Sequence, residues 1–555
     1  MHLNQPKIIL HGQDALLKAF KGVETLAKTV SATMGSHGRM ILIDRGRFNE
    51  PVFSRDGVSV AKEVGIEDPV EASGYSVVFE ASRRTNEEAG DGTTNSIVLA
   101  HAMIEEGIKH VLARRNVLRL SSGMVKAAQK ILEKMKEVTK KINFEEELIS
   151  VATISAQDSE IGRVVAEVMT KVGAEGSVVT DINPGGNSID WVLQEGMHIQ
   201  NGFYSPFFIT DPKRLEYNEE GVYVLVCGDS IEQATQIAPI MEKLLEKHKE
   251  EGKGTLNLLV IAPAFRDFGI DFFVKNKMNG LLRPVLVKAP LSGQYMRGIL
   301  EDIAIKTGGT FHYSEDGTPL PTTPAEANAT SFGFAERVIV GKDKTVIVGG
   351  MGDTKKIEER ADFLRSMQKE TTEAFDKETY GERISSLTSG VGVVRISAKT
   401  EAQTEELRFR VEDALCAAKA ALSEGTVPGG GVALLRAAQL AMIDDDLRLL
   451  DDDEMAGAQI VLAAVRKPAW QIATNAGESG EVIVHEILKR GEDGDSLDIG
   501  YNLNTRRYEN MREAGVIDPA KAIRSALENS VGVASAFLTM GGSITTKHQE
   551  VPEKK

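Results

Sequence analysis

The 555-residue sequence contains only two cysteines, Cys227 and Cys416. Two thiols cannot form a disulfide framework or a cysteine-rich metal site, and a reducing compartment is the simplest expectation. No run approaches the ~18 apolar residues that a membrane-spanning helix needs. Residues 1–12, which include Pro6 and Lys7, lack the apolar core of a signal peptide. These absences predict a cytoplasmic protein that does not bind membranes.

Basic residues are also too few to suggest a nucleic-acid partner. The chain has 65 Lys and Arg against 81 Asp and Glu, which gives a net charge of −16, whereas neutralising phosphates requires a basic face. Two acidic runs, Asp444–Asp446 and Asp451–Glu454, are most simply interpreted as a solvated loop. The length exceeds the ~250–300 residues of a single core, so two or three domains are expected.

Hydrophobic periodicity predicts how these domains are arranged. Apolar residues at helical spacing predict a helix over 14–34 and helix over most of 69–137, with a break at Gly90–Gly92. Between about 195 and 391, strand-like runs alternate with amphipathic segments, which is typical of an α/β domain. These strands are expected at 222–227, 256–262 and 284–288. From about 400 the pattern is helical again, so the chain leaves one helical domain and returns to it.

The segment Ala89-Gly-Asp-Gly-Thr-Thr94 carries the strongest chemical signal. Its glycines let the backbone approach a ligand and direct successive amides at an anion. Thr93 and Thr94 add hydroxyl donors, and the N-terminus of the following helix favours negative charge. Asp91 can hold a Mg²⁺ ion that bridges phosphate oxygens. By itself the segment is equally well read as a glycine-rich turn, because the sequence has no Gly-x-x-x-x-Gly-Lys-[Ser/Thr] loop.

Three further loops have a similar character. Thr33–Gly38 is rich in donors, Asp56–Ala61 places a carboxylate before a helix, and Val427–Ala433 exposes backbone before another helix. Each of them is more often a turn than a site. Together with Ala89–Thr94 they are hard to explain as turns.

This set of loops resembles the group I chaperonins, the GroEL type, in order along nearly the whole chain. The Gly202–Phe208 segment and the Pro-Gly-Gly-Gly loop point to group I, since Ala89–Thr94 would also fit the group II relatives. The other matching segments are Thr153–Ala156, Glu195–Met197, Val287–Pro290, Asp302–Ala304, Thr307–Gly309, Val411–Leu415, Pro428–Leu434, Gly500–Asn502 and Gly515–Pro519.

The resemblance implies an α/β multidomain fold in three parts. A mostly helical equatorial ATP-binding domain (1–137 and 424–555) is formed by both chain ends. A small intermediate hinge domain (138–194 and 392–423) joins it to an α/β apical domain that binds polypeptide (195–391). The implied activity is ATP hydrolysis with Mg²⁺, and K⁺ as a further ion, coupled to the enclosure and refolding of unfolded polypeptides. The implied assembly is a homo-oligomer, a double ring of seven, with a GroES-type co-chaperonin as partner.

The resemblance also assigns roles at the nucleotide. It makes Asp91 the metal ligand, Asp413 the carboxylate that positions the attacking water, and Asp56 a second carboxylate at the γ-phosphate. These roles suit phosphoryl transfer, where orientation and charge neutralisation supply most of the catalysis. Without the resemblance, Asp413 would be interpreted as a solvated residue on a helix. The remaining nucleotide-binding residues are expected to be Thr33, Met34, Gly35, Ser36, Arg55, Gly92, Thr93, Thr94, Asn95, Gly430, Asn502, Leu503 and Asp518.

The resemblance further implies an apolar groove in the apical domain that grips unfolded clients. Such a surface suits the task, because unfolded clients share little besides exposed apolar groups. Gly196 and Gly390 correspond to the hinge, where glycine tolerates a backbone swing. The alternative for the groove aromatics is that some of them fill a core. The expected groove residues are Phe203, Phe207, Phe208, Ala238, Met241, Ile270, Val274 and Lys275.

Several positions depart from the family pattern, which is typical of a diverged paralogue. The departures are Ser36-His37, Asn95, Leu503, Ala238, Phe268, Lys275, the segment Leu291–Gly298, and the absence of C-terminal Gly-Gly-Met repeats. Three functions therefore stay open: an ATP-driven foldase, a divergent chaperonin that binds polypeptide but cycles weakly, and a signalling or adhesion protein on the same scaffold. Both carboxylates at the γ-phosphate favour the first, and the altered groove favours the second.

Overall fold

The computed structural model describes residues 7–44, 52–142, 145–173, 176, 178–182, 188–212, 214–250, 252, 254–326, 331–371, 373–388, 390–398, 400–492 and 496–546. The chain forms two compact units. Unit 1 takes residues 1–170, 184–189 and 397–555, and unit 2 takes 171–183 and 190–396. The finer division into three domains stays a prediction. No helix in the described ranges is both long and apolar enough to cross a membrane.

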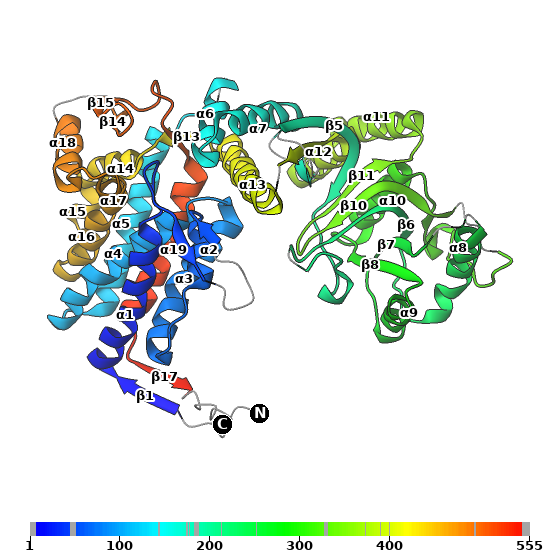
Figure 1. Ribbon diagram of the computed structural model, residues 1–555, viewed down its shortest axis with the longest axis horizontal. Coiled ribbons are helices and arrows are strands. Elements are labelled where there is room, and N and C mark those ends of the chain that lie inside the picture. Colours follow the sequence, from blue (N-terminus) through cyan, green and yellow to red (C-terminus); the bar gives the residue numbers. More distant parts are fainter. Residues whose placement is uncertain are drawn as a thin grey trace. The chain divides into compact units, whose positions relative to one another are not determined.

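Unit 1 is mainly helical and is formed by both ends of the chain (Figure 1). Its N-terminal elements are β1 (Lys7–His11), α1 (Gly12–Ser31), β2 (Ile41–Ile43), β3 (Val52–Ser54), α2 (Gly57–Glu63), α3 (Pro69–Ala89), α4 (Thr93–Leu112), α5 (Val117–Val138), α6 (Glu145–Ala156) and α7 (Ser159–Val172). Its C-terminal elements are α13 (Glu401–Glu424), β13 (Thr426–Pro428), α14 (Val432–Met442), α15 (Asp445–Arg448), α16 (Asp452–Ala464), α17 (Lys467–Asn475), α18 (Gly480–Glu492), β14 (Ile499–Asn502), β15 (Arg507–Asn510), β16 (Ile517–Pro519), α19 (Ala520–Leu538) and β17 (Gly542–Thr546).

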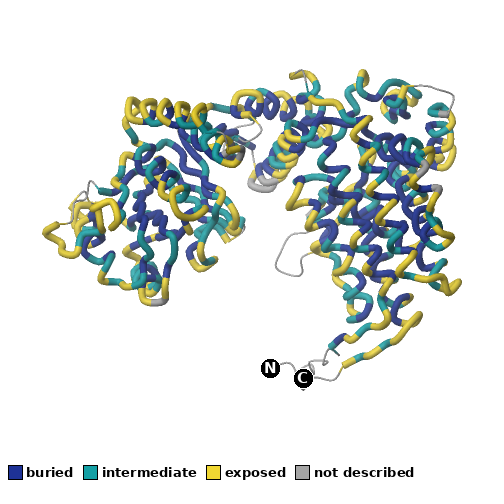
Figure 2. The backbone as a smooth tube through the Cα atoms, turned by 180° about the vertical axis from the view of Figure 1, so that it is seen from behind, coloured by how far each residue is buried: buried dark blue, intermediate teal, exposed yellow. Residues whose placement is uncertain are grey.

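The core of unit 1 joins helices that are distant in sequence. Apolar side chains of α1, α3, α4, α5, α14, α16 and α19 share one buried cluster. Figure 2 colours the buried residues along these helices dark blue. The helices predicted over 14–34 and on both sides of Gly90–Gly92 are confirmed. Each of them packs into the core because its apolar residues recur every three to four positions and form one face. A second break, at Ala113–Asn116, had no glycine to signal it. Here Arg114 has a φ of 60°, and the Asn116 side chain caps α5.

The solvated loop predicted for the two acidic runs is wrong. Asp444 caps the short helix α15, where its side chain accepts from the Asp446 amide. Asp451 caps α16, where its side chain accepts from the amides of Asp453 and Glu454. Acidic side chains are favoured at helix N-termini, because they satisfy free amides and oppose the helix dipole. Glu454 in the first turn of α16 is buried and pairs with Lys126 at 2.9 Å. The acidic runs therefore start helices.

The first and last strands of unit 1 pair with each other. Strands β1 and β17 are antiparallel, with Lys7 opposite Thr546 and His11 opposite Gly542, and Figure 1 shows them side by side. The backbone amide of Gly12 also donates to the carbonyl oxygen of Gly541 at 3.0 Å. Unit 1 is therefore closed by the two ends of the described chain.

Unit 2 is an α/β structure around a mixed sheet. Its elements are β4 (Val178–Ile182), β5 (Ser188–Ile199), the 3₁₀ helix η1 (Pro206–Phe208), β6 (Tyr217–Cys227), η2 (Ala234–Gln236), α8 (Ala238–Glu250), β7 (Leu256–Ala262), α9 (Asp267–Met278), β8 (Leu282–Lys288), α10 (Gly293–Thr307), β9 (Phe311–His312), η3 (Ser314–Asp316), β10 (Gly333–Val340), β11 (Thr345–Gly350), α11 (Thr354–Glu370), α12 (Ala374–Thr388) and β12 (Gly390–Ser397). The described strands run in the order β4-β12-β5-β11-β10-β6-β7-β8, and β9 pairs with β6. Strands β6, β7 and β8 are parallel to one another, and the strands predicted at 222–227, 256–262 and 284–288 lie within them.

A buried carboxylate fixes helices α10, α11 and α12 of unit 2. Asp302 on α10 is 2% exposed. It accepts from Arg360 at 2.7 Å and from Arg383 at 2.6 Å. A buried carboxylate between two guanidinium groups is stable only while both partners remain, so this network holds the three helices in one arrangement.

Candidate functional site

The turn between α3 and α4 is shaped for a ligand that approaches the backbone. Gly92 is the N-cap of α4 with a φ of 81°, and no described side chain caps this helix. A Cβ atom on Gly92 would lie 2.9 Å from the carbonyl oxygen of Ala522, so only glycine fits. The first amides of α4, at Thr93 and Thr94, thus keep their capacity to bind an anion, and the helix dipole favours negative charge there.

Asp56 is held against this turn by the start of α2. Its carboxylate accepts from the amides of Val58 at 3.1 Å and Ser59 at 2.8 Å. A Cβ atom on neighbouring Gly57 would lie 2.2 Å from Oγ1 of Thr94, so the two turns are in direct contact. The helix-capping role fixes the position of the Asp56 carboxylate next to α4.

Asp413 and Cys416 bring helix α13 to the same place. A Cβ atom on Gly90 would lie 2.7 Å from Sγ of Cys416, so α13 touches the turn before α4. Water reaches the Asp413 carboxyl, but protein encloses it on its other sides. This enclosure, and then the negative charges of Asp56 and Asp91, raise the pKa of Asp413 well above its ordinary value. Cys416 is exposed, but the protein packed around its thiol, and then the charge of Asp413, raise its pKa to about 12, so the thiol adds no charge.

Asp518 approaches the turn from strand β16. Residue Asp518 pairs with Val427 of β13, and a Cβ atom on Gly429 would lie 3.2 Å from its Oδ1. Burial, and then the charge of Asp91, raise the pKa of Asp518 to about 7. Burial and the charge of Asp56 also raise the pKa of Asp91, against the opposing hydrogen bond from the Gly92 amide at 2.5 Å.

Asp56, Asp91, Asp413 and Asp518 therefore form one carboxylate cluster. The pKa shifts of Asp91, Asp413 and Asp518 arise from burial and from neighbouring carboxylates, and no lysine or arginine appears among their causes. A cation would relieve this repulsion. The described residues contain no preformed group of three or more metal-ligating side chains. A Mg²⁺ ion here would therefore take most of its oxygen ligands from water and from a bound phosphate, which is its usual behaviour in proteins.

The first predicted nucleotide loop, Thr33–Gly38, is clamped from a distant helix. The Asn475 side chain donates to the carbonyl oxygens of Ser31 at 2.8 Å and Met34 at 2.9 Å. Thr33 and Met34 are buried, Gly35 has a φ of 83°, and the hydroxyl of Ser36 lies 3.1 Å from Nδ1 of His37. The loop is thus held by hydrogen bonds to its backbone and leaves Ser36 exposed.

The remaining predicted nucleotide residues lie around β14 and the glycine loop. Asn502 is buried, and its side chain donates to Glu509 at 2.7 Å and accepts from the Asn504 amide at 3.0 Å. Leu503 is half-buried beside it. A Cβ atom on Gly430 would lie 3.2 Å from the Met511 methyl carbon. Two further predicted residues lie next to the turns already described: Asn95 is half-buried in the first turn of α4, and Arg55 is exposed and donates to Gln157 at 2.6 Å.

Sequence reasoning missed three residues that shape this site. Asn475 clamps the first loop, Cys416 packs on Gly90, and Met511 contacts Gly430. Asn475 lies 441 positions from Met34, and no local pattern connects the two. Only the spacing of Cys416 from Asp413, about one helical turn, offered a signal.

The predicted polypeptide groove is only partly exposed. Phe207 on η1 is 49% exposed, whereas Phe208 and Met241 are 0% exposed and belong to the core of unit 2. The interpretation that some groove residues fill a core therefore applies to these two. Lys275 is exposed, and Phe203, Ala238, Ile270 and Val274 are half-buried.

The two predicted hinge glycines are tightly packed. A Cβ atom on Gly196 would lie 2.5 Å from the carbonyl oxygen of Ile347, and one on Gly390 would lie 2.8 Å from that of Gln194. The packing explains why glycine occurs at both positions, and their role as a hinge stays a prediction.

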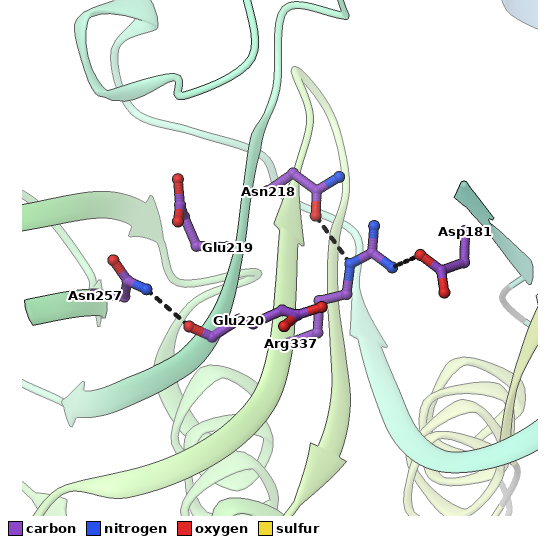
Figure 3. Close-up of a pocket in the computed structure, with 6 residues that line it drawn as sticks. All are labelled: Asp181, Asn218, Glu219, Glu220, Asn257 and Arg337. Atoms are coloured by element: carbon purple, nitrogen blue, oxygen red, sulfur yellow. Dashed lines mark hydrogen bonds and ion pairs between the residues drawn. The ribbon is translucent and has the colours of Figure 1, made fainter. Parts of the chain in front are cut away.

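Unit 2 also has a polar recess of about 520 Å³ between β4, β6, β7 and β10. Figure 3 shows Arg337 between Asn218 and Asp181. The guanidinium donates to Asn218 at 2.9 Å and to Asp181 at 2.8 Å. Since its charged groups are largely satisfied by one another, we assign no ligand to this recess.

Unit 1 is helical and formed by both chain ends, and it carries glycine turns beside an acidic cluster. An α/β unit is inserted into its sequence. This organisation is that of a chaperonin-type protein. The model of the TCP-1/cpn60 chaperonin family matches residues 26–548, so the chain belongs to this family. Among solved structures it is similar to the crystal structure of the chaperonin gp146 from the bacteriophage EL 2 (Pseudomonas aeruginosa), determined in the presence of ATP-BeFx. The TM-score is 0.68 at 19% sequence identity, over 98% of this chain and 100% of that chain. The predicted chaperonin family and fold are confirmed.

Proposed function

We propose that the chain is an ATP-hydrolysing chaperonin subunit that acts in a ring and binds unfolded polypeptide. The observation that carries the proposal is the carboxylate cluster beside the uncapped N-terminus of α4. A free helix N-terminus attracts an anion, and clustered carboxylates attract a cation. A nucleotide phosphate that carries Mg²⁺ presents both. The similar phage chaperonin was crystallised in the presence of ATP-BeFx, which supports nucleotide binding by this chain.

The residues present fit such a ligand. The φ of 81° at Gly92 and the short distance to Ala522 make the turn a backbone cradle. When bound, Mg·ATP supplies the transferable phosphoryl group and the positive charge that the cluster lacks. Asp91 would hold the metal, and the amides of Thr93 and Thr94 would orient the phosphates.

Asp413 and Asp56 are proposed to assist the attack of water on the γ-phosphate. The raised pKa of Asp413 makes its carboxylate a better proton acceptor than an ordinary aspartate. Asp413 would orient the attacking water and accept its hydrogen bond. Asp56, whose carboxylate is fixed by the amides of Val58 and Ser59, would be the second carboxylate at the γ-phosphate. Because this role belongs mainly to the transition state, it raises turnover more than nucleotide affinity.

A second candidate is a chaperonin that binds polypeptide but cycles weakly. The buried side chains of Phe208 and Met241, with the exposed ammonium of Lys275 on α9, favour it, since they leave less exposed apolar surface. Clients, ring number and the GroES-type co-chaperonin belong to the proposal in both cases.

Steady-state ATPase turnover separates the two candidates. In the foldase, Asp413→Ala should lower kcat about 100-fold or more and change nucleotide affinity less than about threefold. Glu67→Gln, which removes an exposed carboxylate outside the site, is the matched control and should keep full turnover. Hydrolysis by Asp413→Ala at the parent rate would refute the assignment, and a parent without turnover would leave the second candidate.

Polypeptide capture needs a separate test. Phe207→Ser removes the exposed aromatic ring of η1 and should lower capture of a chemically unfolded model protein. Phe375→Ser, at a 54% exposed aromatic residue on α12, is the matched control. Equal loss in both variants would show that no specific surface on η1 binds clients.

A further inference from the structure

Lys277 in the last turn of α9 is fixed to the backbone of η1. Its ammonium donates to the carbonyl oxygen of Phe207 at 2.5 Å and to that of Ile209 at 3.4 Å. The same nitrogen lies 5.0 Å from the ring centroid of Phe207 and 5.9 Å from that of Phe208. An ammonium within about 6 Å of an aromatic face is attracted to it. These contacts hold one positive charge beside the exposed ring of Phe207.

This charge lacks an acidic partner among the described residues, whereas some other cations of unit 2 have one. Arg266 at the start of α9 pairs with Glu232, and Lys243 on α8 pairs with Glu246. Burial lowers the pKa of Lys277, and no carboxylate opposes that shift. An ammonium has three N–H donors, of which two are directed at the carbonyl oxygens. One donor and an uncompensated charge remain next to an apolar ring.

The surface around Phe207 therefore offers an apolar contact and, beside it, an ammonium donor for a carboxylate. The chain as a whole carries a net charge of −16, so its long-range field repels acidic segments. A preference for acidic segments can arise only from a local, partly desolvated cation, where a charged hydrogen bond is stronger than in water.

From this geometry we propose that Lys277 is a specificity-determining residue. It selects unfolded segments in which an aspartate or glutamate lies next to an aromatic or aliphatic residue. The apolar side chain contacts Phe207 and the neighbouring carboxylate accepts from the Lys277 ammonium. The inference rests on the proposed polypeptide-binding function and names its substrate class.

Two unfolded peptides of the same apolar sequence test the proposal, one with glutamate next to each phenylalanine and one with glutamine there. Their affinities for the full chain are measured by fluorescence anisotropy. The glutamate peptide should bind about three- to tenfold more tightly, as expected for a partly buried charged hydrogen bond. High salt should reduce the ratio. Lys277→Met should bring the ratio of the two affinities to about one. Lys277→Arg keeps the positive charge and should preserve the ratio, which controls for a general effect of substitution at this position.

The control Lys356→Met removes an exposed lysine of α11 and should leave the ratio unchanged. A ratio near one in the parent, or a preference that persists in Lys277→Met, overturns the role of Lys277. If both peptides bind equally and Phe207→Ser weakens both, polypeptide binding stands and only the selectivity fails. If neither peptide binds, the proposed polypeptide binding fails and the inference with it.

Discussion

Removing one charge from the carboxylate cluster should stabilise the nucleotide-free protein. The pKa of Asp518 rises from its ordinary value of 3.8 to about 7, and each step of one in pKa corresponds to about 1.4 kcal/mol. Ionised Asp518 would thus oppose folding by at most about 4 kcal/mol. Because water partly reaches the carboxyl, we expect that Asp518→Asn raises the free energy of unfolding by about 1–2 kcal/mol near pH 8.

The effect of Asp518→Asn should depend on pH in a defined direction. Below about pH 4 the carboxyl is protonated in both the folded and the unfolded parent, so parent and variant should be equally stable. As the pH rises from about 4 to about 7, the unfolded parent ionises and the folded parent does not, so the parent loses stability relative to the variant. Above about pH 7 the difference should stay constant. Urea denaturation at several pH values measures it, and the variant's Tm near pH 8 should be a few °C higher.

Mg·ADP should reverse the order of stability. The ligand stabilises the folded state in proportion to its affinity, and the parent keeps the carboxylate that faces the ligand. Glu67→Gln removes one exposed negative charge from unit 1 and serves as the control for net charge. A variant that is less stable than the parent without nucleotide at all pH values, or a pH-independent difference, would refute the view that the cluster is mutually repulsive.

Four further predictions follow from the geometry. Gly92→Ala places a Cβ atom 2.9 Å from the Ala522 carbonyl oxygen at a φ of 81°, so isothermal titration should show about tenfold weaker Mg·ATP binding; unchanged affinity would remove this turn from the site. Asn475→Ala loses both hydrogen bonds to the first loop and should cost about 1–2 kcal/mol of stability and raise KM for ATP more than it lowers kcat. Asp302→Asn leaves the guanidinium of Arg383 without its charge partner and should lower the free energy of unfolding by about 3 kcal/mol, with nucleotide affinity unchanged; a neutral result would contradict the role of the network. Sedimentation velocity should reveal a species whose mass is many times the 60.2 kDa of one chain. A stable monomer in the presence of ATP would contradict the proposed ring.

Features that depend on neighbouring residues could be predicted from the sequence. The helix over 14–34 and the strand at 256–262 follow from periodic apolar residues, and the structure has α1 and β7 at those places. The break before α4 followed from two glycines. The break before α5 could not, because it depends on Arg114 in a left-handed conformation that glycine usually adopts.

Features that depend on contacts between distant parts of the chain could not be predicted from the sequence. A run of aspartates can form a loop or start a helix, depending on the apolar surface that the following helix buries. The prediction for Asp451–Glu454 is wrong because that burial cannot be seen in the run itself. Phe207 and Phe208 are adjacent and chemically identical, yet one is exposed and the other is buried. The predicted nucleotide residues follow from the family resemblance alone. Their proximity depends on contacts such as that between Gly90 and Cys416, which are 326 positions apart in the sequence.

The pairing of β1 with β17 has a consequence for synthesis on the ribosome. Most of unit 2 is a continuous stretch, residues 190–396, which can fold as soon as it leaves the exit tunnel, since domains fold as units during translation. The folding of unit 1 cannot be completed until later, because Lys7 pairs with Thr546, which is synthesised near the end of the chain. Under the proposed function, each nascent chain therefore presents Phe207 and Lys277 before unit 1 is complete, and during that interval it would bind polypeptide without control by nucleotide.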